Sequence, residues 1–330
     1  MTMNDCSPDT DYTKGLNLWQ RMAYYLLCGI VYVFSLLPLR VLYLLSDGLY
    51  LLLCCVVRYR VDIVRKNLRE SFPGKTDAEL LAIERDFYHW FCDYIFETVK
   101  VASISKAEMR RRVTYNNMAY VNAQVEARRN VVLYLAHYCN WEWVTSFGLY
   151  VPPYVDGGQI YHPLENRIFD ALMLRIRSRM GTANVPMAAV LRCFVRLRRE
   201  KRPFVFGFIS DQIPMLQSTH YWTDFLGHPD TLVITGTERL AKQFDAVCVY
   251  LDIRRPRRGY YDITIVPMAE QTHDIPDWQI TEQYFRLLEG TIRRDPAYWL
   301  WTHNRWKRSL DVLLRFNQAV GKDTPSVGGI

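Results

Sequence analysis

The feature that most constrains this chain is an uncharged, largely apolar run near its N-terminus. Residues 22–39 contain no Asp, Glu, Lys, Arg or His over 18 positions. A bilayer span needs about 20 mostly apolar residues. The apolar character then resumes, interrupted only by Arg40 and Asp47. We therefore predict that residues 22–57 form a membrane anchor, either one span followed by an interfacial helix or a hairpin that turns near Pro38.

Basic residues follow this apolar region at once, namely Arg58, Arg60, Arg65, Lys66 and Arg69. By the positive-inside rule, the large C-terminal part then faces the cytoplasm. A buried helix pair in a soluble protein is the alternative reading of the same run. The formal net charge of +7 suits an anionic membrane surface or an acidic protein partner. Because no nucleic-acid-binding motif accompanies the basic residues, we expect no nucleic-acid partner.

Downstream of the basic residues, the hydrophobic pattern alternates between helices and strands. A capping box, Thr76 with Glu79, predicts the start of a helix that runs towards Val101. Short apolar runs predict strands at 131–136, 159–162, 203–209, 246–253 and 260–266. Helical patterns separate them at 140–150, 164–180, 188–199, 234–244 and 280–294. This alternation predicts an α/β fold with a central mixed sheet flanked by helices.

The strongest chemical signal is the segment His137-Tyr-Cys-Asn-Trp-Glu142, which follows the predicted strand 131–136. Asn140 is a suitable N-cap, which places Glu142 in the first turn of the next helix. Across such a strand–turn–helix junction the two side chains can converge. An imidazole that takes a proton from a hydroxyl, with a carboxylate on its other nitrogen, is a working general base. A histidine that only satisfies a strand end is the alternative interpretation.

The H-x4-E segment and several downstream motifs resemble one family in the same order along nearly the whole chain. This family is the late acyltransferases of lipid A biosynthesis, within the wider H-x4-D/E lysophospholipid acyltransferases. The matching segments are Tyr161-His-Pro-x-x-Asn166, Arg177-Ser-Arg179-Met-Gly181, Ile209-Ser-Asp211-Gln212, Gly236-Thr-Glu-Arg239 and Pro296-Ala-Tyr-Trp-Leu-Trp301-Thr-His303-Asn-Arg305-Trp-Lys307.

The resemblance implies a glycerolipid acyltransferase-like fold and an enzyme of the bacterial inner membrane whose catalytic domain faces the cytoplasm. It implies an acyl-carrier-protein thioester as donor and a lipid A precursor as acceptor, with His137 and Glu142 as catalytic residues and direct transfer without an acyl-enzyme. No metal or organic cofactor is expected, and no C-x-x-C pair suggests a zinc site. A transferase acting on a lysophospholipid or aminolipid, a coenzyme A donor, and a non-catalytic lipid-binding protein remain open.

The same motifs supply candidate substrate-binding residues. The family usually has arginine where this chain has His162, a position expected to contact the acceptor head group. An arginine fork suits a phosphate group, which makes Arg177 and Arg179 candidates for the same task. The remaining candidates are Asn140, Asp211, Gln212, Arg305 and Lys307.

These assignments divide the chain into five parts. We predict an N-terminal tail (1–21), the membrane anchor (22–57), a helical region (58–112), the α/β acyltransferase domain (113–308) and a flexible C-terminal tail (309–330).

Overall fold

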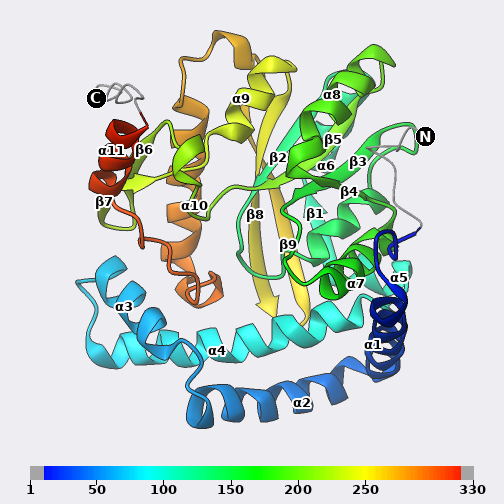
Figure 1. The fold of residues 1–330 in the computed structure, drawn as a ribbon, viewed down its shortest axis with the longest axis vertical. Coiled ribbons are helices and arrows are strands. Elements are labelled where there is room, and N and C mark those ends of the chain that lie inside the picture. The colour runs from blue at the N-terminus through cyan, green and yellow to red at the C-terminus, as the bar shows by residue number, and fades with distance from the viewer. Residues whose placement is uncertain (1–10, 321–330) are drawn as a thin grey trace.

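The computed structural model describes residues 11–320 and contains a seven-stranded mixed sheet (Figure 1). The strand order is β1-β9-β8-β2-β5-β3-β4. The strands are β1 (Val113–Asn116), β2 (Val131–Leu135), β3 (Asp156–Tyr161), β4 (Ala183–Pro186), β5 (Phe204–Ile209), β8 (Val247–Arg257) and β9 (Tyr260–Ala269). The predicted α/β class and its central mixed sheet are therefore confirmed.

One strand pair makes the sheet mixed. β8 and β9, both predicted as strands, pair antiparallel, and every other neighbouring pair in this sheet is parallel. The turn between β8 and β9 contains Gly259 at φ 76°, a left-handed conformation that glycine adopts without strain. A separate antiparallel pair, β6 (Trp222–Phe225) and β7 (His228–Leu232), was not predicted.

The helices that alternate with the strands along the chain flank the sheet (Figure 1). They are α6 (Met118–Glu126), α7 (Arg167–Arg177), α8 (Val190–Arg199), α9 (Gly236–Gln243) and α10 (Gln279–Arg294). α7 begins three residues later than predicted because the Asn166 side chain caps it, accepting from the backbone N–H groups of Ile168 and Phe169. The helix predicted at 140–150 is instead a 3-10 helix, Trp143–Leu149, whose Thr145 hydroxyl donates to a main-chain carbonyl of the preceding turn.

The N-terminal part consists of α1 (Leu18–Leu36) and α2 (Leu39–Leu51), followed by a π-helical turn, Leu52–Val56. Within residues 11–320, neither helix has by itself the length and apolar composition of a membrane span. Leu18–Leu36 and Leu39–Cys54 pass that test only as a pair, and the pair is bent by 112°. The bend falls at Pro38, where the hairpin alternative placed its turn.

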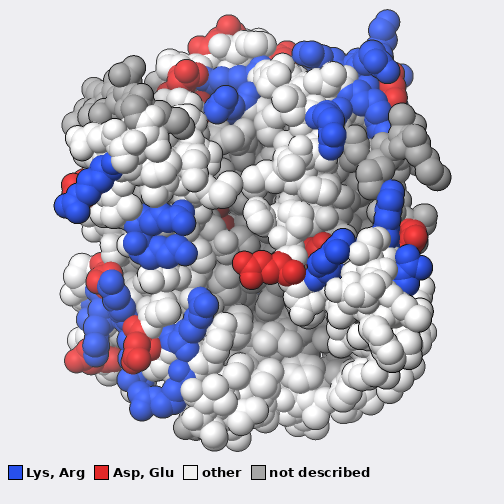
Figure 2. Space-filling view, viewed as in Figure 1, with Lys and Arg blue, Asp and Glu red and all other residues white. Residues whose placement is uncertain are grey.

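Large apolar side chains of α1 and α2 are exposed, for example Trp19 (77%), Leu26 (67%) and Leu44 (70%). In the space-filling view, the edge of the molecule that α2 forms is almost without charged side chains (Figure 2). Basic side chains, interspersed with acidic ones, lie instead on the flank beside it, over α3 (Val61–Ser71). An amphipathic surface of this kind is typical of proteins that contact a membrane.

A long helix, α4 (Asp77–Lys100), separates this N-terminal part from the sheet (Figure 1). The predicted capping box is confirmed, because the Thr76 hydroxyl accepts from the Glu79 backbone and the Glu79 carboxylate accepts from the Thr76 backbone. α2 lies along α4, and a short helix, α5 (Lys106–Arg112), leads into β1. α4 is therefore in position to contact both the N-terminal helices and the strands.

The predicted C-terminal tail, residues 309–330, contains a helix in its first part. This helix, α11 (Leu310–Ala319), buries Leu313 and Asn317. The apolar periodicity of this segment is short, and burial against the β6–β7 side of the molecule stabilises it. The ends of both predicted tails, residues 1–10 and 321–330, lie outside the described residues.

Candidate active site

His137 and Asp211 meet at the carboxyl edge of the sheet, at the ends of two neighbouring strands. β2 and β5 run parallel with Leu135 opposite Ile209, and the N–H of Ser210 donates to the carbonyl of Leu135 at 3.2 Å. Each site residue therefore follows its strand by two positions. The carboxyl edge of a parallel sheet is where α/β proteins usually place their sites.

The imidazole of His137 has a defined partner on each nitrogen. Its Nδ1 lies 2.8 Å from Oδ1 of Asp211, and the backbone N–H of His137 donates to Oδ2 of the same carboxylate at 3.1 Å. Its Nε2 lies 3.3 Å from the side-chain nitrogen of Gln212. A carboxylate on Nδ1 fixes the tautomer in which Nε2 is the free base.

The Asp211 carboxylate is itself held firmly. The indole N–H of Trp299 donates to Oδ2 at 2.8 Å, and the buried guanidinium of Arg305 donates to the Asp211 carbonyl at 2.7 Å. Burial opposes ionisation, but the charge of His137 and the hydrogen bonds from His137 and Trp299 outweigh it and hold the pKa of Asp211 below its usual range. Asp211 therefore stays ionised at neutral pH.

The predicted contact between Glu142 and His137 is not the one that forms. Glu142 is buried and accepts both parallel bonds of a guanidinium fork, from Nε of Arg177 at 2.7 Å and from Nη2 at 2.6 Å. The reason is the shape of the loop, in which Cys139 adopts a left-handed φ of 51° and Glu142 leads directly into the 3-10 helix. Asp211, which the sequence suggested only as a substrate-binding residue, takes the position at Nδ1.

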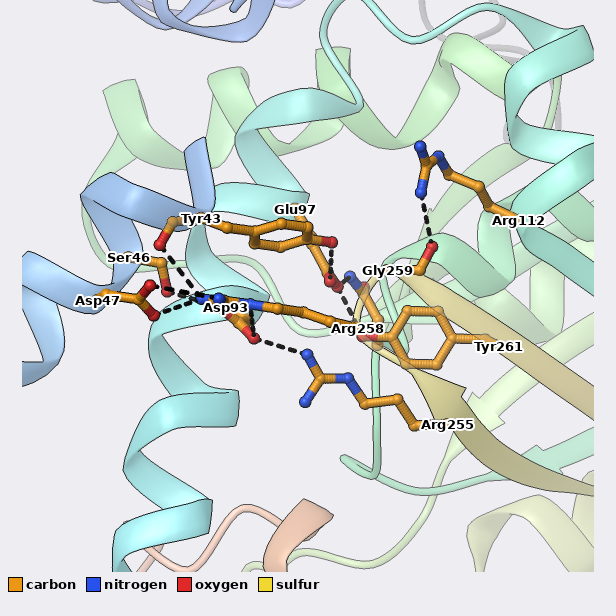
Figure 3. Close-up of polar contacts among 11 residues, drawn as sticks. Tyr43, Ser46, Asp47, Asp93, Glu97, Arg112, Arg255, Arg258, Gly259 and Tyr261 are labelled. Carbon is orange, nitrogen blue, oxygen red and sulfur yellow. Dashed lines mark hydrogen bonds and ion pairs between the residues drawn. The ribbon is translucent and has the colours of Figure 1, made fainter. Parts of the chain in front are cut away.

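Asn140 has a structural position behind the loop. Its side-chain oxygen accepts from the backbone N–H of Trp143 at 3.1 Å, so the predicted capping contact is present. Its side-chain nitrogen donates at 2.7 Å to the carboxylate of Glu97, a buried residue of α4. Glu97 also accepts from the hydroxyl of Tyr43 on α2 and that of Tyr261 on β9 (Figure 3). Asn140 therefore fixes the loop and is too buried to contact a substrate.

A cavity of about 580 Å³ lies over this edge of the sheet. His137, Glu142, Arg177 and Gln212 line it together, although they come from three separate segments. Positions on the strands contribute mainly apolar side chains, including Leu133, Leu135, Ile160 and Ile209. The segments that follow the strands contribute His162, Leu164, Pro214, Met215 and Ser218, and helix α9 contributes Arg239. The volume lies within the range of ordinary ligand pockets.

Of the remaining predicted substrate-binding residues, His162 is exposed and lines this cavity. Arg179 and Lys307 are also exposed, but neither is among the residues that line the cavity. Arg305 is buried and donates to the carbonyls of Asp211 and Leu232, and burial lowers its pKa to about 10.

Two residues of the site were not predicted from the sequence. Trp299, which holds Asp211, lies in the C-terminal motif that resembles the family, but its side chain could equally have been core. Glu97 is an acidic residue in the apolar stripe of a helix, and nothing in the sequence indicates its partners. Its carboxylate accepts hydrogen bonds from Tyr43, Asn140 and Tyr261, and its backbone carbonyl accepts one from the indole of Trp143.

Comparison with known proteins agrees with the motifs. A family model described as bacterial lipid A biosynthesis acyltransferase matches residues 12–308. A lipid A biosynthesis lauroyltransferase of Escherichia coli (strain K12) is 22% identical over 282 residues, which cover 84% of this chain and 89% of that protein. A lipid A biosynthesis acyltransferase of Haemophilus influenzae is 22% identical over 255 residues, which cover 76% of this chain and 79% of that protein.

Proposed function

Because the chain belongs to the bacterial lipid A biosynthesis acyltransferase family, and is therefore an acyltransferase, we propose that His137 acts as its general base. The donor we propose is a fatty acyl thioester of acyl carrier protein, and the acceptor is a hydroxyl of a lipid A precursor. The observation that supports this most directly is the ionised Asp211 on Nδ1 of an imidazole that lines the cavity.

The proposed reaction is a direct transfer. Nε2 of His137 takes the proton of the acceptor hydroxyl as its oxygen attacks the thioester carbonyl carbon. The carbon–sulfur bond of the tetrahedral intermediate then breaks, and the imidazolium returns the proton to the thiolate of the carrier. The products are an ester and a free thiol, and no acyl group is attached to the protein.

Three groups around His137 would assist this step. Asp211 orients the imidazole and stabilises the imidazolium that forms. The side-chain amide of Gln212, 3.3 Å from Nε2, is close enough to donate to the developing oxyanion, together with backbone N–H groups near Asn140. Glu142 acts from the cavity wall by holding Arg177, rather than through the imidazole.

The acyl chain would lie in the apolar part of the cavity, against the side chains that the strands contribute. The exposed apolar side chains of α1 and α2 would rest in the inner membrane, with the catalytic domain on the cytoplasmic side. This placement brings the cavity to the layer that contains a lipid acceptor.

The test is acyl transfer by the full chain in vesicles, followed by mass spectrometry of the lipid product. With an acyl carrier protein thioester and a lipid A precursor, we expect one added acyl chain. His137→Ala should reduce kcat by about 10²–10⁴, the usual contribution of a general base, while its circular dichroism stays unchanged. Near-normal turnover of the variant would refute the assignment, and acylation of a lysophospholipid instead would redirect it to another acceptor.

A further inference from the structure

The charged residues that line the cavity do not balance. Glu142 is the acid among them, and Arg177 and Arg239 are the arginines, which leaves one positive charge in excess. Glu142 and Arg177 neutralise each other in their bidentate pair. Arg239 is exposed, and within residues 11–320 it has no carboxylate partner and no side-chain hydrogen bond. The excess charge therefore belongs to Arg239.

The place of Arg239 strengthens its attraction for an anion. It lies in the first turn of α9, and the two residues at the start of that helix, Thr235 and Gly236, also line the cavity. The first N–H groups of a helix have no intrahelical acceptor, and the helix dipole adds positive potential there. A side chain at Gly236 would meet no atom within 4 Å, so the helix start faces open space.

The start of α9 is fixed next to the catalytic pair. The hydroxyls of Ser210 and Thr237 lie 2.8 Å apart, which joins the end of β5 to the first turn of the helix. Ser210 directly precedes Asp211 in the chain. A group bound at Arg239 would thus lie in the same cavity as the imidazole of His137.

One acid in the same turn could have cancelled this potential, but it is used elsewhere. The carboxylate of Glu238 is buried and accepts from the backbone N–H groups of Trp278 and Thr281 at 2.7 and 2.8 Å, at the start of α10. Lys242 lies 3.3 Å from it. Its charge is therefore compensated on the side away from the cavity lining.

We propose that Arg239 and the first turn of α9 form a phosphate-binding subsite of the active site. The inference rests on the proposed acyl transfer. A phosphate group can come from either substrate, as a phosphate on the acceptor lipid or as the phosphodiester of the carrier protein's prosthetic arm. A guanidinium suits both, because its parallel N–H groups match two phosphate oxygens.

The experiment compares Arg239→Gln with Arg315→Gln, which changes an exposed arginine of α11 that lies outside the cavity lining. Loss of a charge-assisted bond to phosphate should raise the KM of one substrate by about 10- to 100-fold with kcat nearly unchanged. Arg315→Gln should leave both KM values as they are. Arg239→Lys should restore part of the affinity, because it keeps the charge but not the fork.

Two phosphate-free substrates identify the source. If the acceptor phosphate is bound, the effect of Arg239→Gln should disappear with acceptor lipid that has been treated with a phosphatase. If the carrier phosphodiester is bound, it should disappear with an acyl-N-acetylcysteamine donor. An effect that persists with both phosphate-free substrates, or no effect on either KM, overturns the proposal.

A binding measurement separates this proposal from the reaction itself. Isothermal titration calorimetry of the His137→Ala protein in detergent micelles gives its affinity for phosphorylated acceptor or for carrier protein in the absence of turnover. Adding Arg239→Gln to that background should weaken the binding of one of them by about 10- to 100-fold. If the wild-type protein transfers no acyl group but this weakening is seen, the proposed acyl transfer is refuted and the proposed phosphate-binding subsite is supported. If the His137→Ala protein binds each substrate equally well with and without Arg239→Gln, the proposed subsite is refuted.

Discussion

Two buried carboxylates, Asp93 and Asp211, organise two regions of the molecule in different ways. Asp93, on α4, accepts from the hydroxyl of Ser46 and from the guanidinium groups of Arg255 and Arg258 (Figure 3). Arg258 reaches on to Asp47, so α2 and α4 are tied to the β8–β9 turn. None of these residues is among those that line the cavity. This network joins elements of the fold and presents nothing to a ligand.

Asp211 has a comparable number of partners, but one of them faces the cavity. Its carboxylate holds His137, whose Nε2 lies on the far side of the ring from that contact and beside Gln212. Burial and charge pairing are therefore shared by both regions and do not by themselves mark a site. Ion-pair networks that are purely structural also perturb the pKa values of their members. What distinguishes the Asp211 region is a reactive atom, Nε2 of His137, that faces the cavity.

The largest difference between the two regions should appear in turnover. Asp211→Asn removes the charge that stabilises the imidazolium and can favour the wrong tautomer, so kcat should fall by about 10²–10⁴. Asp93→Asn is the matched control, because it is the same change at an equally buried site, and kcat of its folded form should change by less than about threefold. Steady-state kinetics in vesicles measure both. Equal losses in the two variants would show that the comparison does not separate catalysis from structure.

The second difference concerns two ion pairs and separates stability from activity. Glu142→Gln and Asp93→Asn each leave buried guanidinium groups without their carboxylate, which costs about 3 kcal/mol or more. Thermal unfolding in detergent should therefore show both variants melting several degrees lower. Only Glu142→Gln should also lose activity when assayed below its midpoint, and Glu142→Asp should retain part of it. An Asp93 variant that is equally inactive while folded would contradict this assignment.

The sequence carried enough information for most of the sheet and for the catalytic histidine. Buried strands such as β2 and β5 read as continuous apolar runs, because a parallel strand covered on both faces has no polar side. β8 and β9 were equally recognisable as strands from their apolar runs. His137 was predictable from its motif, and its place at a strand end followed from the same hydrophobic pattern.

The partners of His137 could not be predicted in the same way. Which carboxylate reaches Nδ1 depends on the strand order, which places Asp211 beside His137 across 74 positions of sequence. A five-residue spacing made Glu142 the nearer candidate, and the left-handed turn at Cys139 that sends it to Arg177 left no pattern in the sequence. The same limit applies to Arg239, because an arginine without a carboxylate partner is recognisable only once all its neighbours are placed.

The smallest effect is a difference in pH dependence between Asp211 and Glu97. Burial raises the pKa of Glu97, and the charge of Arg255 and the hydrogen bonds from Tyr261 and Asn140 only partly offset it, whereas the pKa of Asp211 is lowered. A carboxyl with a raised pKa contributes stability that is present at low pH and is lost as pH rises from the unfolded value, about 4.3, through the folded one. A carboxyl with a lowered pKa contributes stability that is present above the unfolded value, about 3.9, and is lost only below it.

These opposite signs can be measured with two amide variants. The free energy of unfolding in urea, relative to the wild type, should shift against Asp211→Asn as pH rises from about 3 to 5, because only the wild type gains the stability of an ionised Asp211. For Glu97→Gln the same difference should shift in favour of the variant as pH rises from about 4, by at most about 1.4 kcal/mol per pH unit within the window, because the variant lacks the buried charge. Parallel pH profiles for the two variants would show that Glu97 is held ionised as firmly as Asp211, and that the network behind the loop resembles the catalytic pair more closely than its contacts suggest.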